Sequence, residues 1–427
     1  MILLIARSAT AVFIEGVDAS YLQQIEDYGG VYYENGAATN ALQIFKDSGV
    51  NYVRLRIWNA PSSGYCGMSN TLVMAQRVKN LGMGLLLDFH YSDTWADPGH
   101  QAKPAAWTNL AFRQLQAALE DYTSNTIAQL KSQNTLPDIV QIGNEITAGF
   151  LWDDGKVGGS YDTNWVRFVA LLNSAIQGVT TNLHGETVKI MLHVDAGGNN
   201  ATCRWFFDHI VSNDIPFDVI GLSFYPWWQG TLNDLSSNIN DLAVRYGKGI
   251  MVVETAYPWT LDAYDSMNNL VGLPSQLHTG FPATVEGQGD FLCAEKNLIR
   301  RATNSAGTGW FYWAPDDISA PGLPSAWENC ALFDFQGNSL GSLHVFGDVP
   351  YDGCTTVVSS VTILNGALNL SIANLPLGTS SRLQRAAAVG SNSWSNVTSF
   401  VSQNGRTNWT ETTSNGANNA FYRISSP

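Results

Sequence analysis

The stretch Val140-Gln-Ile-Gly-Asn-Glu-Ile146 combines an apolar strand with a carboxylate at the end of that strand. Pro137 and Asp138 break the preceding helical pattern, and the apolar run 139–142 then predicts a buried strand. Burying an unpaired carboxylate is costly, but a carboxyl group whose pKa is raised is a good general acid. We therefore interpret Glu145 as a candidate catalytic acid. The alternative is an ordinary strand-end carboxylate, either solvated or capping a helix.

The same order of strand, loop and helix recurs on both sides of this stretch. Continuous apolar runs of this kind, alternating with helices, favour a closed parallel barrel over an open doubly wound sheet. The predicted fold is therefore α/β, a (β/α)8 TIM barrel over residues 13–348. The predicted strands are 13–18, 50–58, 83–90, 139–142, 188–195, 217–225, 249–254 and 307–313, and the predicted helices are 38–47, 70–81, 110–131, 164–183, 202–212, 232–246 and 285–301.

Polar and aromatic side chains concentrate where these strands end and are scarce where they begin. Active sites of such barrels lie at the carboxyl ends of the strands, so this asymmetry predicts a site there. The residues at these ends are Asp18, Arg54, Arg56, Trp58, Asp88, His90, Asp93, Trp95, Asn144, Glu145, His193, Asp195, Tyr225, Trp227, Trp228, Glu254, Trp313, Asp316 and Asp317.

Glu254 ends the apolar run of strand seven just as Glu145 follows strand four. These strands lie across a closed barrel from each other, so the two carboxylates can meet over its mouth. Two such groups are the minimal apparatus of glycoside hydrolysis. Arg54 and Arg56 share one strand face and would hold one carboxylate ionised. The alternative for the arginines is an interior salt bridge without a catalytic role, and for His90 a structural histidine at the mouth.

The composition restricts the partners of the chain. A formal charge of −14 and a charged fraction of 14% argue against nucleic acid and anionic membranes. Fourteen tryptophans suit a neutral sugar ligand, because the apolar faces of pyranose rings stack on indoles. The grouping of His90, His193 and Asp195 supports a metal site only weakly. Five scattered cysteines, with no CxxC pair, argue against a zinc site; they leave at least one thiol free or intermolecular and allow one or two disulfides.

The two ends of the chain differ from the barrel. The apolar start, Met1 to Val12, is interpreted as the end of a truncated bacterial signal peptide or as a cloning remnant, so a secreted or periplasmic location is expected. Residues 349–427 lack lysine and carry short alternating runs with turn signals at Asn365-Gly366 and Asn404-Gly405. They predict a small antiparallel β module of uncertain role. Trp394 and Trp409 are candidates for sugar binding there, against a structural or attachment role.

The motifs resemble those of glycoside hydrolase family 53, the endo-β-1,4-galactanases (arabinogalactan endo-1,4-β-galactosidases). The resemblance covers about residues 13–346, and its most specific parts are the DFHYSDTWADP and QIGNEI segments. The matching segments are 16–20 GVDAS, 51–59 NYVRLRIWN, 87–98 LDFHYSDTWADP, 103–107 KPAAW, 141–149 QIGNEITAG, 223–228 SFYPWW, 253–258 VETAYP, 327–329 WEN and 331–334 ALFD.

The resemblance implies a retaining mechanism, with Glu145 as acid/base and Glu254 as nucleophile. It also implies that Asn144 contacts the sugar 2-hydroxyl and that Arg54 and Tyr225 contact the nucleophile. The further substrate-binding residues expected at the mouth are Asp88, His90, Trp95, Trp227, Trp228, Trp313 and Trp327. A retaining reaction predicts carboxyl groups about 5–5.5 Å apart.

Two features depart from the family pattern. Strand eight reads Phe311-Tyr-Trp-Ala-Pro315 where the family has glutamate in place of Ala314, which puts a subsite contact or a hydrogen bond in doubt. Some bacterial members bind calcium after strand seven. Asp262, Asp265 and Asn268 stand in this loop, but their spacing is imperfect, so no cofactor is expected.

The sequence thus predicts a monomeric, secreted endo-hydrolase of β-1,4-galactan from pectic arabinogalactan. Within the same class, the alternative is a retaining β-glucanase or β-mannanase on the same barrel. In another class, the alternative is a non-catalytic polysaccharide-binding protein that kept its cleft. Retention of Asn144 and both glutamates argues against the latter.

Overall fold

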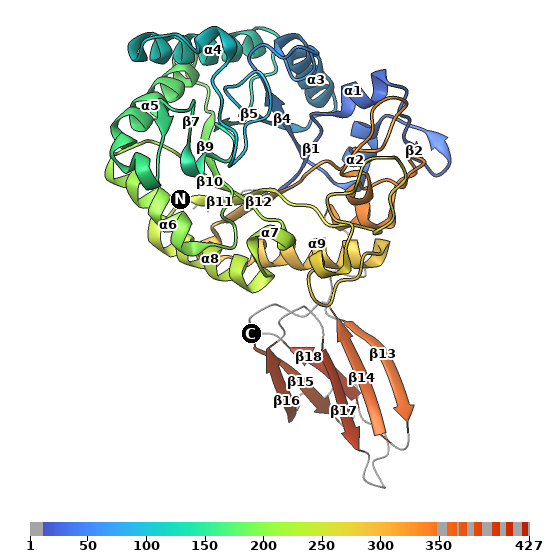
Figure 1. Ribbon diagram of the computed structural model, residues 1–427. Coiled ribbons are helices and arrows are strands. Elements are labelled where there is room, and N and C mark those ends of the chain that lie inside the picture. Colours follow the sequence, from blue (N-terminus) through green and yellow to red (C-terminus); the bar gives the residue numbers. More distant parts are fainter. Residues whose placement is uncertain are drawn as a thin grey trace, which may run out of the picture.

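Eight parallel strands close into a barrel in the computed structural model (Figure 1). The structure describes residues 12–347 and the segments 357–364, 367–373, 380–386, 395–401, 407–412 and 421–425. Around the barrel the strands follow chain order, and β1 closes the ring by pairing with both β12 and β4. The (β/α)8 prediction is therefore confirmed. The strands are β1 (Ile14–Asp18), β4 (Tyr52–Ile57), β5 (Gly84–Phe89), β6 (Ile139–Ile142), β9 (Lys189–Val194), β10 (Val219–Ser223), β11 (Gly249–Glu254) and β12 (Gly307–Tyr312).

Helices surround the barrel, and each of the seven predicted helices is present with ends shifted by a few residues. They are α2 (Ala41–Ser48), α3 (Met68–Asn80), α4 (Phe112–Ser132), α5 (Trp165–Thr180), α6 (Asn200–Ser212), α8 (Leu232–Tyr246) and α9 (Val285–Arg300). The sequence analysis missed the short elements α1 (Leu22–Asp27), β2 (Tyr33–Glu34), β3 (Ala37–Ala38), β7 (Gly149–Phe150), β8 (Gly155–Lys156) and α7 (Pro226–Gln229). All of these hold six residues or fewer, too short to show a periodic pattern.

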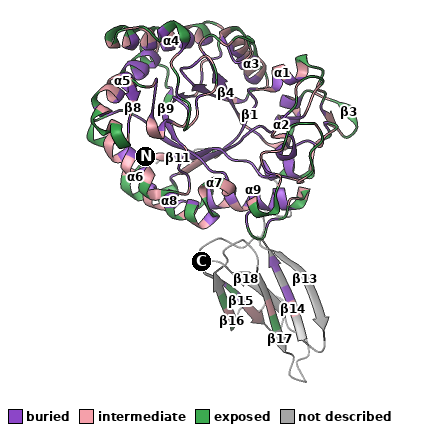
Figure 2. Ribbon diagram, viewed as in Figure 1, coloured by how far each residue is buried: buried purple, intermediate pink, exposed green. Residues whose placement is uncertain are grey.

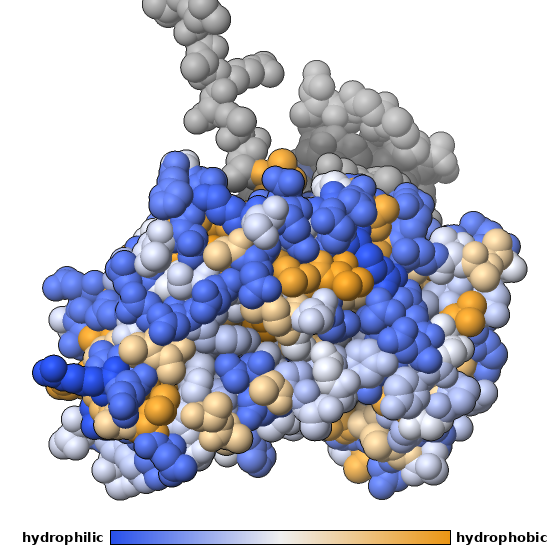
Figure 3. All heavy atoms as spheres, turned by 90° about the horizontal axis from the view of Figure 1, so that it is seen from above, coloured by the Kyte–Doolittle hydropathy of each residue, from blue (hydrophilic) through white to orange (hydrophobic). Residues whose placement is uncertain are grey.

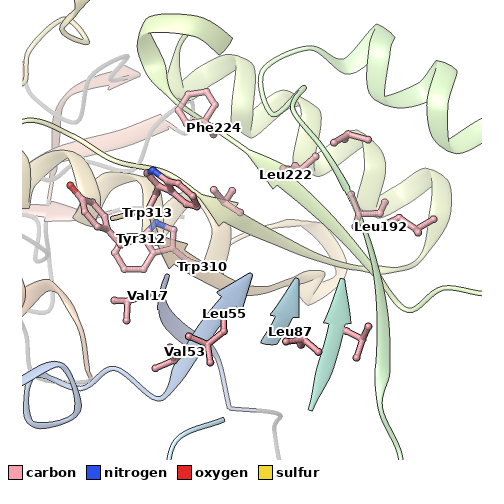
Figure 4. Packing of buried hydrophobic residues seen from close by; sticks show 14 of the residues in the cluster. Val17, Val53, Leu55, Leu87, Leu192, Leu222, Phe224, Trp310, Tyr312 and Trp313 are labelled. Carbon is pink, nitrogen blue, oxygen red and sulfur yellow. The ribbon is translucent and has the colours of Figure 1, made fainter. Parts of the chain in front are cut away.

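Successive residues of each strand alternate between the barrel interior and the layer of helices. Outward side chains such as Val17, Leu55 and Leu87 join the large core beneath the helices (Figure 4). Figure 2 shows the barrel strands mostly buried, whereas the helices are buried mainly on the side that faces the strands.

Inward positions change character along the strands. Near the strand starts they are apolar and form a separate small core of Ile14, Leu86, Ile139, Met191, Val219, Met251, Val253 and Phe311. Gly16 is needed in this layer, because a Cβ there would lie 2.2 Å from ring carbons of Phe311. Two residues further along the same strands, the inward positions carry polar residues such as Asp88, Gln141 and His193, all of which are buried. The apolar layer thus closes the barrel below a polar layer that faces its mouth.

Six further strands lie outside the barrel and form two three-stranded antiparallel sheets (Figure 1). Trp409 packs against a small core of Leu370, Ile372 and Leu383. The expected start of this module at residue 349, Trp394 and both Asn-Gly turns lie outside the described residues. The strands are β13 (Val357–Leu364), β14 (Ala367–Ala373), β15 (Ser380–Ala386), β16 (Ser395–Val401), β17 (Thr407–Thr412) and β18 (Phe421–Ser425).

Several expectations concern the chain as a whole. Cys66, Cys203 and Cys330 are free thiols, and Cys293 is disulfide-bonded. Among the described residues, no helix is long and apolar enough to cross a membrane. The surface seen in Figure 3 is mainly hydrophilic, with hydrophobic residues in small, separate groups. The proposed signal-peptide remnant lies almost wholly outside the described residues.

Glu15, on β1, connects the first strand of the barrel to α9 and to Gly347. Its carboxylate lies 3.2 Å from Lys296 Nζ, contacts Arg300, and accepts a hydrogen bond of 2.7 Å from the backbone N–H of Gly347. Glu15 and Lys296 are both buried, so water weakens their attraction little.

We predict that Glu15→Gln lowers the free energy of unfolding by about 3–5 kcal/mol, because it removes a buried anion that contacts Lys296, Arg300 and the backbone N–H of Gly347. Urea unfolding followed by tryptophan fluorescence measures this change. The control is Asp121→Asn, at an exposed position of α4, which should change the value by less than about 0.5 kcal/mol. Equal effects of the two substitutions would contradict the prediction.

Candidate active site

A cavity of about 1070 Å³ opens at the carboxyl ends of the strands. Glu145, which follows β6, and Glu254, the last residue of β11, both line it. Around the ring, β6 and β11 are separated by two strands on one side and four on the other, so they face each other across the mouth. The two glutamates therefore share one cleft. The other candidate residues that line the cavity are Trp95, Asn144, Tyr225, Trp228, Trp313 and Trp327.

The fully buried guanidinium of Arg54 holds the floor of this site together. Its Nη1 donates to Asp18 at 2.8 Å, and its Nη2 lies 2.9 Å from both Asp88 and Glu254. Nη2 also donates to Asn144 Oδ1 at 2.8 Å, while Nε donates to Gln141 Oε1 at 3.2 Å. One cation thus contacts three carboxylates and two amides, which fixes their positions relative to one another.

In the part of the chain that the structure describes, Arg56 packs among aromatic rings and does not pair with either glutamate of the cleft. Its guanidinium lies 4.0 Å from the ring centroid of Tyr21 and 4.2 Å from that of Trp95, and it forms no ion pair with Glu254 among the described residues. Arg54 therefore contacts Glu254 directly, whereas Arg56 favours ionisation of another carboxyl group, that of Asp317. The two arginines differ because Arg56 lies two residues closer to the carboxyl end of β4, where aromatic side chains fill the barrel interior.

Glu254 is buried among groups that favour its ionised form. Besides the Arg54 contact at 2.9 Å, the hydroxyl of Tyr225 donates to its other carboxylate oxygen at 3.1 Å. Burial raises the pKa of Glu254, as do the charges of Asp88 and Asp18, whereas Arg54 and Tyr225 lower it, and the balance leaves this pKa at about 7. Without these two partners the carboxyl would be a weaker acid still.

Among the residues that the structure describes, Glu145 has no cationic partner at such a distance. Ser223 Oγ donates to its Oε1 at 2.6 Å, and the backbone N–H of Glu145 donates to His193 Nδ1 at 3.2 Å. Burial, with further contributions from the charges of Glu254 and Asp195, raises the pKa of Glu145 well above its ordinary value. The residue also has φ of 49° and ψ of 52°, a left-handed conformation that is unfavourable for a non-glycine residue.

Gln101 helps to hold this unusual backbone in place. Its side-chain Nε2 donates to the backbone carbonyl oxygen of Asn144 at 2.7 Å. The backbone carbonyl of Gln101 accepts a hydrogen bond of 2.8 Å from the backbone N–H of Trp152. The peptide group between Asn144 and Glu145 is therefore held at its oxygen by Gln101 and at its nitrogen by His193. The sequence analysis missed the contributions of Gln101, Gln141 and Ser223. Inward position at a strand end could have indicated the latter two, but Gln101 lies in a loop without a pattern.

Four of the expected substrate-binding residues do not line the cavity. Arg54, Asp88 and His90 are buried behind it, and Trp227 packs beside Tyr225 and Trp327. Asp88 accepts hydrogen bonds from Arg54 and from Gln141 Nε2, the latter at 2.7 Å, and His90 Nδ1 accepts from the backbone N–H of Ala96 at 3.0 Å. In this structure these residues therefore support the lining residues from behind.

Aromatic rings form much of the cavity wall. Trp95 and Trp313 lie with ring centroids 5.8 Å apart, and Trp313 and Trp327 lie 6.2 Å apart. Trp228 is 58% exposed, so its indole is available to a ligand. Ala314, where the sequence departs from the family pattern, is buried and does not line the cavity.

Asp265, in the loop after β11, is hydrogen-bonded within the protein. The carboxylate of Asp265 accepts from Ser319 Oγ and from the backbone N–H groups of Met267 and Ser325. Among the described residues, no group of three or more His, Cys, Asp or Glu side chains could hold a metal ion. Neither the calcium alternative nor the grouping of His90, His193 and Asp195 gains support from this geometry.

A (β/α)8 barrel with two glutamates in one aromatic-walled cleft has the architecture of a glycoside hydrolase. The family model "Glycosyl hydrolase family 53" matches residues 14–346. The chain belongs to glycosyl hydrolase family 53.

Known relatives agree with this assignment. An arabinogalactan endo-beta-1,4-galactanase from Cellvibrio japonicus is 39% identical, over 78% of this chain and 91% of that protein. The GH53 catalytic domain of Ignisphaera aggregans superposes with a TM-score of 0.74 at 40% identity, covering 78% of this chain and 95% of that domain. A structure described as one of two fungal beta-1,4-galactanases gives a TM-score of 0.70 at 34% identity, covering 79% of this chain and all of that one.

We predict that Arg54→Lys raises the pKa of Glu254 above its value of about 7. An ammonium group is a point charge that cannot reach three carboxylates at once, so the ionised form of Glu254 loses stabilisation. A carbon-13 NMR titration of side-chain-labelled glutamate measures the shift, with Glu254 assigned by its absence from Glu254→Gln. Arg77→Lys, which alters a surface pair with Glu26, is the control and should leave the resonance unchanged. A pKa that stays at its original value in Arg54→Lys would contradict the prediction.

Proposed function

We propose that this protein is a retaining endo-hydrolase of β-1,4-galactan, the side chains of pectic arabinogalactan. The observation that carries the proposal is that two carboxyl groups in one cleft have different surroundings. Glu254 contacts a guanidinium and a tyrosine hydroxyl, whereas the Glu145 carboxyl accepts from the neutral hydroxyl of Ser223 and is strongly desolvated. The activity for which these relatives are named supports the choice of galactan.

In the proposed first step, a carboxylate oxygen of Glu254 attacks C1 of the sugar as the bond from C1 to the leaving oxygen breaks. Glu145 gives its proton to that oxygen, so the leaving chain departs as an alcohol. In the second step, Glu145 takes a proton from water while the water oxygen attacks C1 and the bond to Glu254 breaks. Two inversions at C1 retain the β configuration. Such a double displacement requires carboxyl groups about 5–5.5 Å apart.

The groups around the two glutamates fit supporting roles. Asn144 Nδ2 donates one hydrogen bond to the carbonyl of Ala96, which leaves its second hydrogen for the 2-hydroxyl of the bound sugar. Tyr225 keeps Glu254 oriented, and its pKa is well above its ordinary value because it is buried beside Glu254, so it remains a donor. Trp95, Trp228, Trp313 and Trp327 provide stacking surfaces along the chain.

The reaction needs no cofactor, since both proton transfer and nucleophilic attack come from side chains. A polymeric substrate cannot enter a cell intact, so we propose that the enzyme acts outside the cell. We also propose that it acts as a monomer. The net charge of −14 favours a neutral polysaccharide over nucleic acid or anionic membranes.

We predict that the protein releases galacto-oligosaccharides from linear β-1,4-galactan and that Glu254→Gln lowers kcat by roughly 10³-fold or more, because the amide is a poor nucleophile. Reducing-end release and chromatography of the products measure both. The control is Glu286→Gln, at an exposed position on α9, which should retain full activity.

Parallel assays on β-1,4-glucan and β-1,4-mannan test the alternative within the same class. Faster release from either polymer than from galactan would replace the substrate assignment. Binding of galactan without any product would favour the non-catalytic alternative.

We predict that Trp228→Ala raises KM for galactan about five- to tenfold with little change in kcat, since an exposed aromatic platform binds ground state and transition state alike. Initial rates over a range of galactan concentrations measure the two parameters. Val211→Ala, which truncates an exposed side chain on α6 outside the cavity lining, is the control. A loss confined to kcat would contradict a role as binding platform.

A further inference from the structure

A closed set of hydrogen bonds links the backbone of Glu145 to its own carboxyl group. The backbone N–H donates to His193 Nδ1 at 3.2 Å, and His193 Nε2 lies 2.9 Å from Ser223 Oγ. Ser223 Oγ in turn lies 2.6 Å from Glu145 Oε1. His193 and Ser223 are both fully buried and come from the neighbouring strands β9 and β10.

The positions of the hydrogen atoms follow from the groups that can act only as donors. A backbone N–H can only donate, so His193 Nδ1 must accept and carries no hydrogen. Gln141 Nε2 is a second donor 3.0 Å from the same nitrogen, since the oxygen of that amide is already taken by Arg54 Nε. Asn144 Oδ1 also lies 3.0 Å from Nδ1, but it accepts from Arg54 Nη2 instead.

His193 is therefore neutral, with its hydrogen on Nε2. Burial, reinforced by the charge of Arg54, lowers its pKa well below the ordinary value, in agreement with this assignment. Nε2–H donates to Ser223 Oγ, which leaves the single hydrogen of the hydroxyl to donate to Glu145 Oε1.

We propose that His193 and Ser223 are positioning residues that keep the transferable proton of Glu145 on Oε2. Because Oε1 receives the hydrogen of Ser223, a protonated carboxyl must carry its own hydrogen on the other oxygen. Glu145 lines the cavity, so that oxygen is the one available to a substrate. This inference rests on the proposed role of Glu145 as acid/base.

The same arrangement serves both steps of the proposed reaction. When Oε2 gives its proton to the leaving oxygen, the bond from Ser223 becomes a charge-assisted hydrogen bond to a carboxylate and stabilises that anion. When water attacks, its proton returns to Oε2 while Oε1 stays occupied. No net proton passes through His193 or Ser223, so they orient the acid without being consumed.

Other charges face Glu145 and would also affect its titration. Glu254 lies on β11, Asp195 follows β9 and Arg54 lies on β4, and all three influence the pKa of Glu145. The buried Tyr225, which follows β10, is a neutral neighbour. Substitution of Ser223 leaves each of these groups in place, so a change in the pH profile can be assigned to the lost donor.

The test is Ser223→Ala, assayed on two substrates over a range of pH. On galactan, whose leaving group needs a proton, kcat/KM should fall about tenfold or more, and the alkaline limb of its pH profile should move to higher pH. The limb moves upward because the hydroxyl no longer stabilises the Glu145 carboxylate. On 2,4-dinitrophenyl β-1,4-galactobioside, whose leaving group needs no proton, kcat/KM should change by less than about twofold.

Two further variants complete the test. Ser342→Ala removes another fully buried hydroxyl, which donates to Gln288 Oε1. It should leave kcat/KM on both substrates and the position of the alkaline limb unchanged. Ser223→Cys keeps the side-chain volume but donates weakly, so it should fall between wild type and Ser223→Ala, and it serves if the alanine variant does not fold.

Equal losses on both substrates in Ser223→Ala, or an alkaline limb that does not move, would overturn the proposal. Glu145→Gln separates this outcome from failure of the proposed function. If Glu145→Gln shows the selective loss on galactan but Ser223→Ala does not, only the positioning role is wrong. If Glu145→Gln itself spares galactan, then Glu145 is not the acid and both proposals fail.

Discussion

The site depends on one buried cation. Arg54 is fully enclosed in the barrel, where a lone charge would be very costly, and it is surrounded by the carboxylates of Asp18, Asp88 and Glu254. The geometry is fixed because a guanidinium is planar and all three of its nitrogens contact partners. Any change that displaces this group leaves several buried anions uncompensated, so the floor of the cleft is rigid for electrostatic reasons.

The same cation creates the difference between the two glutamates. Both are desolvated, and desolvation alone would raise both pKa values together. Arg54 lies 2.9 Å from Glu254, whereas among the described residues no ion pair to Glu145 is present at 4.0 Å or less. One glutamate is therefore kept closer to its ionised form while the other holds a proton, which is the division that a retaining glycosidase requires.

Much of the fold could be predicted from local patterns. Apolar runs alternating with amphipathic segments gave eight strands and seven helices close to their observed ends, because both are set by the period of burial. The predicted convergence of Glu145 and Glu254 followed from the ring order of a closed barrel.

The partners of individual side chains could not be predicted in the same way. Ser223 and Glu145 are 78 positions apart, and their contact depends on register between strands that no local pattern contains. Arg56 has the same residue type and strand face as Arg54, yet two residues of additional height place it among aromatic rings. Glu15 stands near a strand start, where polar side chains are scarce, and its partners Lys296, Arg300 and Gly347 lie more than 280 positions away.

The central claim is that Glu254, with its carboxylate held ionised, becomes covalently bound to the sugar during turnover. A 2-deoxy-2-fluoro galactobioside with a good leaving group should stall the reaction at this stage. Mass spectrometry of the digested protein then locates the label. The account predicts one fluorosugar attached to the peptide that contains Glu254; attachment to Glu145, or an unlabelled enzyme whose first product has the α configuration, would contradict it.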